Sequence, residues 1–164
     1  YLFHSLGEVG IFVVHLNPKS EDERLSELRH LLRMTRQFKH AIIAGDFNSL
    51  SPHDPYDRKT LLAAFQKQGL EKFGITALRF DCIQLLEDEG FVDVMRVLRK
   101  LFSATVPTPA NTDKAHAVPL RLDYIFVSSS LAPFISNAEI VHSMRTGQAS
   151  DHYPVVVDFK FGIE

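Results

Sequence analysis

The sequence predicts an α/β fold, because strand-like and helical patterns alternate along its first half. Residues 10–14 are a run of strong strand formers, and residues 41–44 are a shorter apolar run that ends at Gly45. Between these runs, residues 20–38 carry apolar side chains at spacings of three and four, which is the pattern of an amphipathic helix. The order strand, helix, strand is typical of α/β proteins.

The composition indicates one ordinary globular domain. The chain has 164 residues, of which 45% are hydrophobic and 23% are charged, so it is long enough to bury a core. Its net charge of −2 provides no overall basic field for nucleic acid or anionic membrane. The single cysteine, Cys82, excludes an internal disulfide and favours an intracellular, reducing location. No apolar run is long enough to span a bilayer, and the absence of an initiator Met indicates that an upstream segment has been removed or omitted.

The N-terminal part predicts a hairpin followed by a helix. Residues 1–6 and 9–16 flank a glycine turn, and the second strand ends with His15. Ser20 and Glu23 have the spacing of a capping box, so we expect the helix to begin there. Its apolar stripe consists of Leu25, Leu28, Leu32, Thr35 and Phe38. Its other face carries a basic row of Arg24, Arg29, Arg33, Arg36 and Lys39. Such a row is typical of a solvated helix face, and a local nucleic-acid contact is the alternative.

The rest of the chain predicts short elements joined by loops. Helices are expected at residues 59–68 and 76–89, with one or two helical turns at 95–102. Strands are expected at 91–94 (or a turn there), 121–127, 138–142 and 155–161. Loops are expected at 49–57, 103–119 and 147–150. Three prolines exclude regular structure from the long loop 103–119, and such a loop usually carries function or covers a site.

Asp46 and Asn48 directly follow the second buried strand. In extended backbone, residues two apart project from the same face. A carboxylate beside a carboxamide at a strand end suits a hard cation or a phosphate oxygen. An ordinary Asp/Asn turn is the alternative, because these residues form such turns readily.

Four polar positions lie at or near strand ends: His15, Asp46 with Asn48, Asp123, and Asp151 with His152. Histidines transfer protons near neutral pH, while carboxylates and amides favour Mg²⁺ or Mn²⁺ over zinc. The sequence has no nucleophile elbow, P-loop, dinucleotide fingerprint or zinc motif. The set therefore indicates attack of water on a phosphoester. For His15 taken alone, the alternative to a catalytic role is that of an ordinary structural histidine. For Asp123 taken alone, the alternative is that of a surface residue at a strand end.

These residues lie in segments that resemble, in order and spacing, motifs of the endonuclease/exonuclease/phosphatase superfamily of DNase I-like phosphoesterases. The segments are residues 14–16 (Val-His-Leu), 45–48 (Gly-Asp-Phe-Asn), 121–126 (Arg-Leu-Asp-Tyr-Ile-Phe) and 150–155 (Ser-Asp-His-Tyr-Pro-Val). The resemblance extends over the whole chain. It implies an α/β fold built as a two-sheet sandwich flanked by helices.

The same resemblance implies roles for the site residues. Asp46 and Asn48 would position the attacking water and the phosphate close to a Mg²⁺ or Mn²⁺ ion, and Asp151 would help to hold that ion. His152, oriented by Asp123, would contact the phosphate and act in acid–base catalysis. His15 would protonate the leaving oxygen or stabilise charge on the phosphate.

The chain departs from the family because it lacks the family's earlier half. That half supplies an Asn on a first strand and a Glu that is the principal metal ligand, and nothing before His15 matches them; Glu8 lies in the hairpin turn. Residues 1–164 thus resemble the C-terminal portion of a single domain, with the N-terminal strands absent. We expect the isolated chain to be weakly active or inert, and its incomplete sheet to pair with a missing N-terminal segment or another chain.

The substrate class stays open among nucleic acid, a phospholipid head group and a small phosphate ester. The loops at residues 49–60 and 103–119 flank the motifs and are expected to set specificity. Further candidate contacts in or near them are His53, Asp54, Asp57, Lys114, His116 and Arg121. For the first three, turn formation is the favoured explanation. The alternative function is a non-catalytic interaction module that retains the fold. The argument against it is that Asp46, Asn48, Asp123, Asp151 and His152 are all present.

Overall fold

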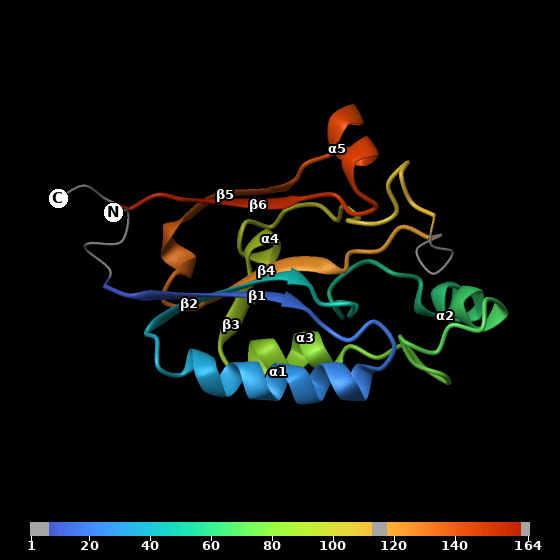
Figure 1. Cartoon of the computed structure of the whole chain (residues 1–164), viewed down its shortest axis with the longest axis horizontal. Coiled ribbons are helices and arrows are strands. Elements are labelled where there is room, and N and C mark those ends of the chain that lie inside the picture. The colour runs from blue at the N-terminus through green and yellow to red at the C-terminus, as the bar shows by residue number, and fades with distance from the viewer. Residues whose placement is uncertain (1–6, 113–117, 162–164) are drawn as a thin grey trace.

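The computed structural model describes residues 7–112 and 118–161, which form two β-sheets and a layer of helices (Figure 1). The first sheet has the strand order β1-β2-β4-β3 and the second pairs β5 with β6. The strands are β1 (Val9–His15), β2 (His40–Asp46), β3 (Phe91–Asp93), β4 (Asp123–Ser128), β5 (Ile135–Ile140) and β6 (Val155–Phe159). The helices are α1 (Glu21–Thr35), α2 (Arg58–Lys67), α3 (Asp81–Asp88), α4 (Val94–Val97), the 3₁₀ turn η2 (Ala132–Phe134) and α5 (Met144–Ala149).

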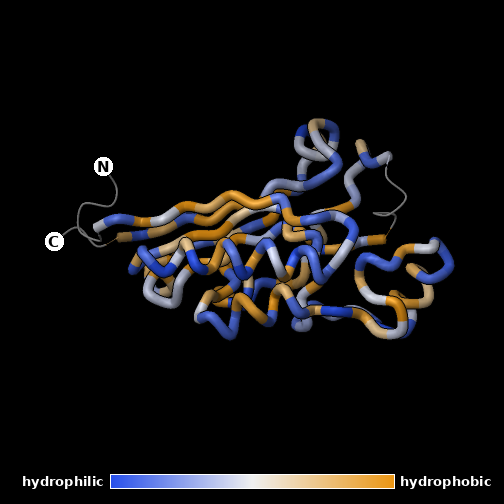
Figure 2. Tube along the Cα trace, turned by 60° about the horizontal axis from the view of Figure 1, so that its bottom comes forward, coloured by the Kyte–Doolittle hydropathy of each residue, from blue (hydrophilic) through white to orange (hydrophobic). Residues whose placement is uncertain are grey.

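The four-stranded sheet is the middle layer of the molecule. Helices α1 and α3 cover one of its faces, and the β5-β6 sheet lies over the other (Figure 1). The core on the helix side joins Leu28 and Leu32 of α1 to Ile43 and Phe126 of the sheet. A second core, between the two sheets, includes Ile125. Hydrophobic stretches accordingly follow the strands, while the helices alternate between hydrophobic and hydrophilic residues (Figure 2). The predicted two-sheet sandwich with flanking helices is confirmed.

Helix α1 forms where the sequence predicts it. Ser20 is its N-cap, and the Ser20 side chain accepts a hydrogen bond from the Glu23 backbone N–H at 3.4 Å. The predicted leucine stripe is buried against the sheet. The predicted solvated row on the opposite face is wrong at one position, because Arg24 is fully buried beside Glu21. No helix among the described residues has the length and apolar character needed to cross a membrane.

Two predicted segments differ from the structure for local reasons. The helix expected at residues 76–89 begins only at Asp81, because the preceding backbone turns back and the Arg79 N–H donates to the Phe73 carbonyl at 2.8 Å. The loop expected at 147–150 is largely helix α5. Ser143 and Thr146 cap that helix reciprocally, with Thr146 in the position where a capping box normally has Glu or Gln.

The remaining boundaries shift by a few residues. The helical turns expected at 95–102 end at Val97, and Arg99 adopts a φ of 51° shortly afterwards. Strand β5 begins at Ile135, three residues before the predicted strand. The predicted first arm of the hairpin, residues 1–6, lies outside the described residues. Strand β1 itself pairs in parallel with β2.

Candidate active site

Three of the predicted site residues lie in one row across neighbouring strands. The register of the parallel β1-β2 pair places His15 beside Asp46, at the ends of both strands. Strand β4 runs antiparallel to β2, so its first residue, Asp123, lies on the other side of Asp46. Residues directly opposite each other on adjacent strands project from the same face of a sheet. The sheet therefore brings together side chains that are distant in sequence.

The backbone around Asp46 is shaped by the residues that flank it. Gly45 has a φ of 137°, and a Cβ at this position would meet the Val14 carbonyl oxygen at 2.0 Å, so only glycine fits. Asn48 adopts a φ of 50°, which Asn tolerates better than most residues. The Asn48 backbone N–H donates to Asp46 Oδ1 at 2.8 Å, and Asn48 Nδ2 donates to Asp46 Oδ2 at 3.1 Å. The Asp/Asn turn considered as an alternative is thus present, and it also fixes the carboxylate.

His152 and Asp123 form a carboxylate–imidazole pair. His152 Nδ1 lies 2.8 Å from Asp123 Oδ2, and because an ionised carboxylate only accepts, Nδ1 carries the shared proton. This hydrogen bond, together with the charge of Asp123, raises the pKa of His152 although burial opposes the shift. The predicted orientation of His152 by Asp123 is therefore present in the geometry.

Replacing Asp123 by Asn is expected to lower the pKa of His152 towards its ordinary value of 6.5. Because the folded-state pKa is raised, the stabilisation is complete below about pH 6.5 and is lost as the pH rises through the folded-state pKa. An NMR titration of the His152 ring protons measures the shift, and thermal unfolding at several pH values measures the linked stability. An identical His152 pKa in both proteins would contradict the pairing.

Thr105 is hydrogen-bonded to the backbone at or next to both members of this pair, although the sequence indicates no role for it. The fully buried Thr105 Oγ1 accepts hydrogen bonds from the backbone N–H groups of Leu122 and Asp123 at 3.0 and 3.2 Å. The Thr105 carbonyl accepts from the N–H of Tyr153, directly after His152, at 2.8 Å. The length of the loop 103–119 predicts that it carries function or covers a site, but no sequence signal singles out this threonine.

The predicted site residues share a pocket of about 440 Å³. Its lining consists of His15, Pro18, Asp46, Asn48, Lys72, Asp123, Asp151 and His152. Burial and the neighbouring Asp123 charge raise the pKa of Asp46, while the Asn48 hydrogen bond and the two histidines oppose the shift. His15 is largely exposed, and its Nε2 lies 3.6 Å from Asp46 Oδ2.

The pocket suits a hard cation in the kind of atom it offers. Asp46, Asn48 and Asp151 present oxygen ligands, and the repulsion between Asp46 and Asp123 would be relieved by positive charge. Within residues 7–112 and 118–161, however, no three His, Cys, Asp or Glu side chains cluster closely enough to hold a metal ion.

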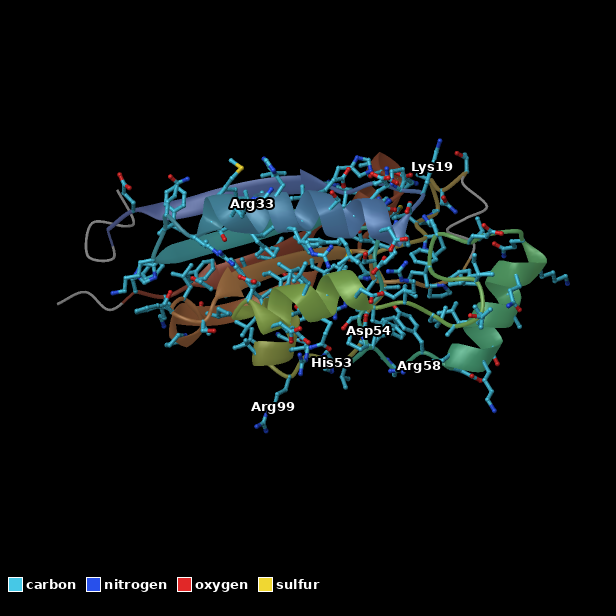
Figure 3. All side chains as sticks on the ribbon, turned by 90° about the horizontal axis from the view of Figure 1, so that it is seen from below. Lys19, Arg33, His53, Asp54, Arg58 and Arg99 are labelled. Atoms are coloured by element: carbon cyan, nitrogen blue, oxygen red, sulfur yellow. The ribbon has the colours of Figure 1, made fainter. Side chains whose placement is uncertain are left out.

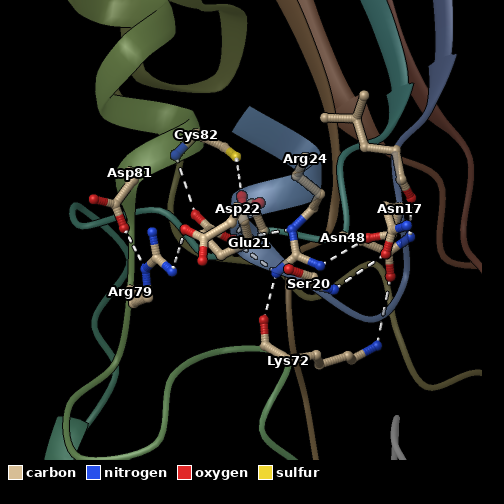
Figure 4. Close-up of polar contacts among 12 residues, drawn as sticks. Asn17, Ser20, Glu21, Asp22, Arg24, Asn48, Lys72, Arg79, Asp81 and Cys82 are labelled. Carbon is tan, nitrogen blue, oxygen red and sulfur yellow. Dashed lines mark hydrogen bonds and ion pairs between the residues drawn. The ribbon is translucent and has the colours of Figure 1, made fainter. Parts of the chain in front are cut away.

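A buried ion pair is hydrogen-bonded to segments that border the pocket (Figure 4). Arg24 Nη2 donates to Glu21 Oε2 at 2.7 Å, and these side chains are 0% and 2% exposed. The same guanidinium donates to the carbonyls of Asn17 and Lys72. Glu21 Oε2 also accepts from the hydroxyl of Ser49, directly after Asn48, at 3.1 Å. One pair thus ties together three segments that border the pocket.

Arg121 and two candidates of the first loop, His53 and Asp54, form their contacts outside the pocket. Arg121, a candidate nucleic-acid contact, has a side chain that is only 4% exposed and pairs with Asp54 at 2.9 Å and Asp93 at 2.6 Å, so that expectation is wrong. His53 pairs with Glu87. Asp54 lies among packed side chains (Figure 3).

Asp57, the remaining candidate in the first loop, is the N-cap of α2. It therefore has a local structural role, as the sequence favours. Lys114 and His116, the candidates in the second loop, lie outside the described residues.

The chain belongs to the endonuclease/exonuclease/phosphatase family. The model of that family matches residues 12–152, which include the row on the sheet and end at His152. A search of curated protein sequences found no match.

Solved structures share the fold at low sequence identity. A 3′ phosphatase, NExo, from Neisseria, bound to a product DNA hairpin, superposes with a TM-score of 0.62 at 19% identity over 92% of this chain and 61% of its own. An AP endonuclease from Archaeoglobus fulgidus gives 0.62 at 18% identity over 94% of this chain and 63% of its own. The AP endonuclease LMAP from Leishmania major gives 0.59 at 20% identity over 87% and 44%. The chain thus spans less than two thirds of the length of these structures.

Proposed function

We propose that this chain carries the catalytic residues of a metal-dependent phosphoesterase, which hydrolyses a phosphodiester or phosphomonoester by in-line attack of water. The observation that carries the proposal is the shared pocket, in which the His15–Asp46–Asp123 row meets the His152–Asp123 pair. Two imidazoles and a partly buried carboxylate with a raised pKa are suited to proton transfer near neutral pH. Family membership supports the same reaction class.

Each residue then has a distinct task. Asp46, held by the Asn48 turn, orients the attacking water and accepts its proton, and Asn48 aligns the phosphate. Protonated His152 donates to a phosphate oxygen, since its pairing with Asp123 favours the charged form. His15, at the exposed rim, protonates the leaving oxygen. Asp46, Asn48 and Asp151 would hold Mg²⁺ or Mn²⁺, which when bound neutralises charge on the phosphate.

Nucleic acid is the substrate class that the structural neighbours favour. One of them is a 3′ phosphatase bound to a DNA hairpin, and others are AP endonucleases.

The unpaired edge of the described sheet is the place where a further segment or chain would join. Strand β1 ends the strand order there, and its Ile11 and Val13 side chains are 61% and 83% exposed.

A hydrolysis assay tests the proposal directly. Bis-p-nitrophenyl phosphate and DNA carrying an abasic site or a 3′ phosphate are incubated with Mg²⁺, using the 164-residue chain and a longer natural chain that contains it. Replacing His152 by Ala is expected to lower turnover about 100- to 10,000-fold, the usual contribution of a general acid or base.

The matched control replaces His30, which is exposed on α1, by Ala and is expected to leave turnover unchanged. Absence of metal-dependent turnover in both chains would overturn the proposal and favour a non-catalytic interaction module. Equal effects of the two histidine substitutions would likewise overturn the assigned role of His152.

A further inference from the structure

Lys72 lines the candidate pocket although no sequence motif includes it. Its neighbours in the lining include all the predicted site residues, and Lys72 Nζ lies 3.5 Å from Asn48 Oδ1. The close-up shows its side chain extending towards the Asn48 carboxamide (Figure 4). Lys72 therefore brings a positive charge to the residue that the proposed function assigns to aligning the phosphate.

The backbone of Lys72 is anchored to the buried ion pair. Its carbonyl accepts a hydrogen bond from Arg24, whose guanidinium is fully buried and paired with Glu21. The adjacent Phe73 is also fully buried, with its ring centroid 4.9 Å from that of Phe65. A lysine on an exposed loop normally loses conformational entropy when it binds a ligand, and this anchoring reduces that loss.

The side chain of Lys72 also has contacts that fix its position. Lys72 Nζ lies 4.8 Å from the centroid of the Phe73 ring, within the range of a cation–π contact. Together with the Asn48 carboxamide, this ring holds the ammonium on the pocket side of the loop. The ammonium thus has a defined position before any ligand arrives.

The charges of the other pocket residues indicate what the Lys72 ammonium can do in this position. Three of the lining residues are carboxylic acids, Asp46, Asp123 and Asp151, and they would repel a phosphate that approaches them. A lysine ammonium is a compact point charge that binds phosphate through strong, charge-assisted hydrogen bonds. An ammonium beside Asn48 would offset part of the acidic field where the phosphoryl oxygens must lie.

We propose that Lys72 is a substrate-binding residue that contacts the phosphoryl group beside Asn48. This inference rests on the proposed function, which supplies the phosphoester substrate. It assigns Lys72 to binding and not to proton transfer. Loss of the ammonium should therefore raise KM more than it lowers kcat.

Binding of inorganic phosphate to the 164-residue chain tests the inference without requiring turnover. Phosphate is titrated while the backbone and side-chain amide signals of Asn48 are followed by NMR. Lys72→Met is expected to weaken phosphate binding about 10-fold or more, the usual effect of removing a hydrogen bond to a charged group. Lys72→Arg, which keeps the charge, is expected to restore part of the affinity.

The matched control is Lys59→Met, which removes an exposed lysine of α2 and should leave phosphate affinity unchanged. Equal phosphate affinity in the wild type and in Lys72→Met, both with native amide spectra, would overturn the inference, as would a wild type that does not bind phosphate. If binding depends on Lys72 but His152→Ala leaves turnover unchanged, the phosphate contact stands and the assigned catalytic chemistry fails.

Discussion

Replacing Asp46 by Asn is expected to lower phosphoester hydrolysis about 100- to 10,000-fold while the protein stays folded. The substitution keeps the size of the side chain and an oxygen that accepts the Asn48 backbone N–H. It removes the negative charge that would take the proton from water. In the folded protein the pKa of Asp46 is raised, so ionisation of this carboxyl opposes folding as the pH rises through that pKa.

The stability of this variant separates catalysis from folding. Removal of the partly buried Asp46 charge and disturbance of the hydrogen bond from Asn48 Nδ2 act in opposite directions, so the free energy of unfolding at neutral pH should change by only about 1 kcal/mol. Turnover and urea denaturation are measured on the same preparation. Asp88→Asn, at an exposed carboxylate of α3, is the control and should change neither quantity. Full activity in Asp46→Asn would exclude Asp46 as the base.

Replacing Arg24 by Ala is expected to produce the largest loss of stability, about 3–5 kcal/mol in the free energy of unfolding. The substitution leaves the carboxylate of Glu21, only 2% exposed, without its counter-charge. It also removes the donor to the Asn17 and Lys72 carbonyls. Breaking a buried pair costs more than breaking a surface pair, because the remaining charge stays desolvated.

Urea denaturation at fixed pH measures this loss. Arg29→Ala changes an exposed arginine of the same helix and is expected to alter stability by no more than about 0.5 kcal/mol. If both variants lose the same free energy, the contribution lies in the helix and not in the pair. Arg24→Lys, which keeps the charge but not the fork of donors, should fall between the wild type and Arg24→Ala.

The features that the sequence predicts well are those with a local signature. Ser20 marks the start of α1 because capping requires only residues three apart, and the leucine stripe identifies its buried face. The site row is predictable from motif order, since each of its members ends or begins a strand. What the sequence cannot provide is the register that makes His15 and Asp123 direct neighbours of Asp46, because register is set by long-range pairing.

Most of the errors share a physical cause. Arg24 and Arg121 look solvent-exposed in sequence, because an arginine is buried only when distant carboxylates pair with it. Thr105 and Lys72 reach the site through loop conformation, which has no periodic pattern. Helix α5 was missed because its cap uses Thr146 in an unusual role. For the two arginines, Thr105 and Lys72, a tertiary contact decides what the local pattern leaves undetermined, whereas α5 depends on a local cap.

The row on the sheet also constrains how such chains can change in length. Helices and loops make up most of the chain between His15, Asp46 and Asp123, and insertions in those helices and loops leave the row unchanged. One residue inserted within β2 would instead turn Asp46 to the opposite face, since side chains alternate along a strand. Functional variants of this chain should therefore vary freely in loop length but keep the lengths of β1 and β2 constant.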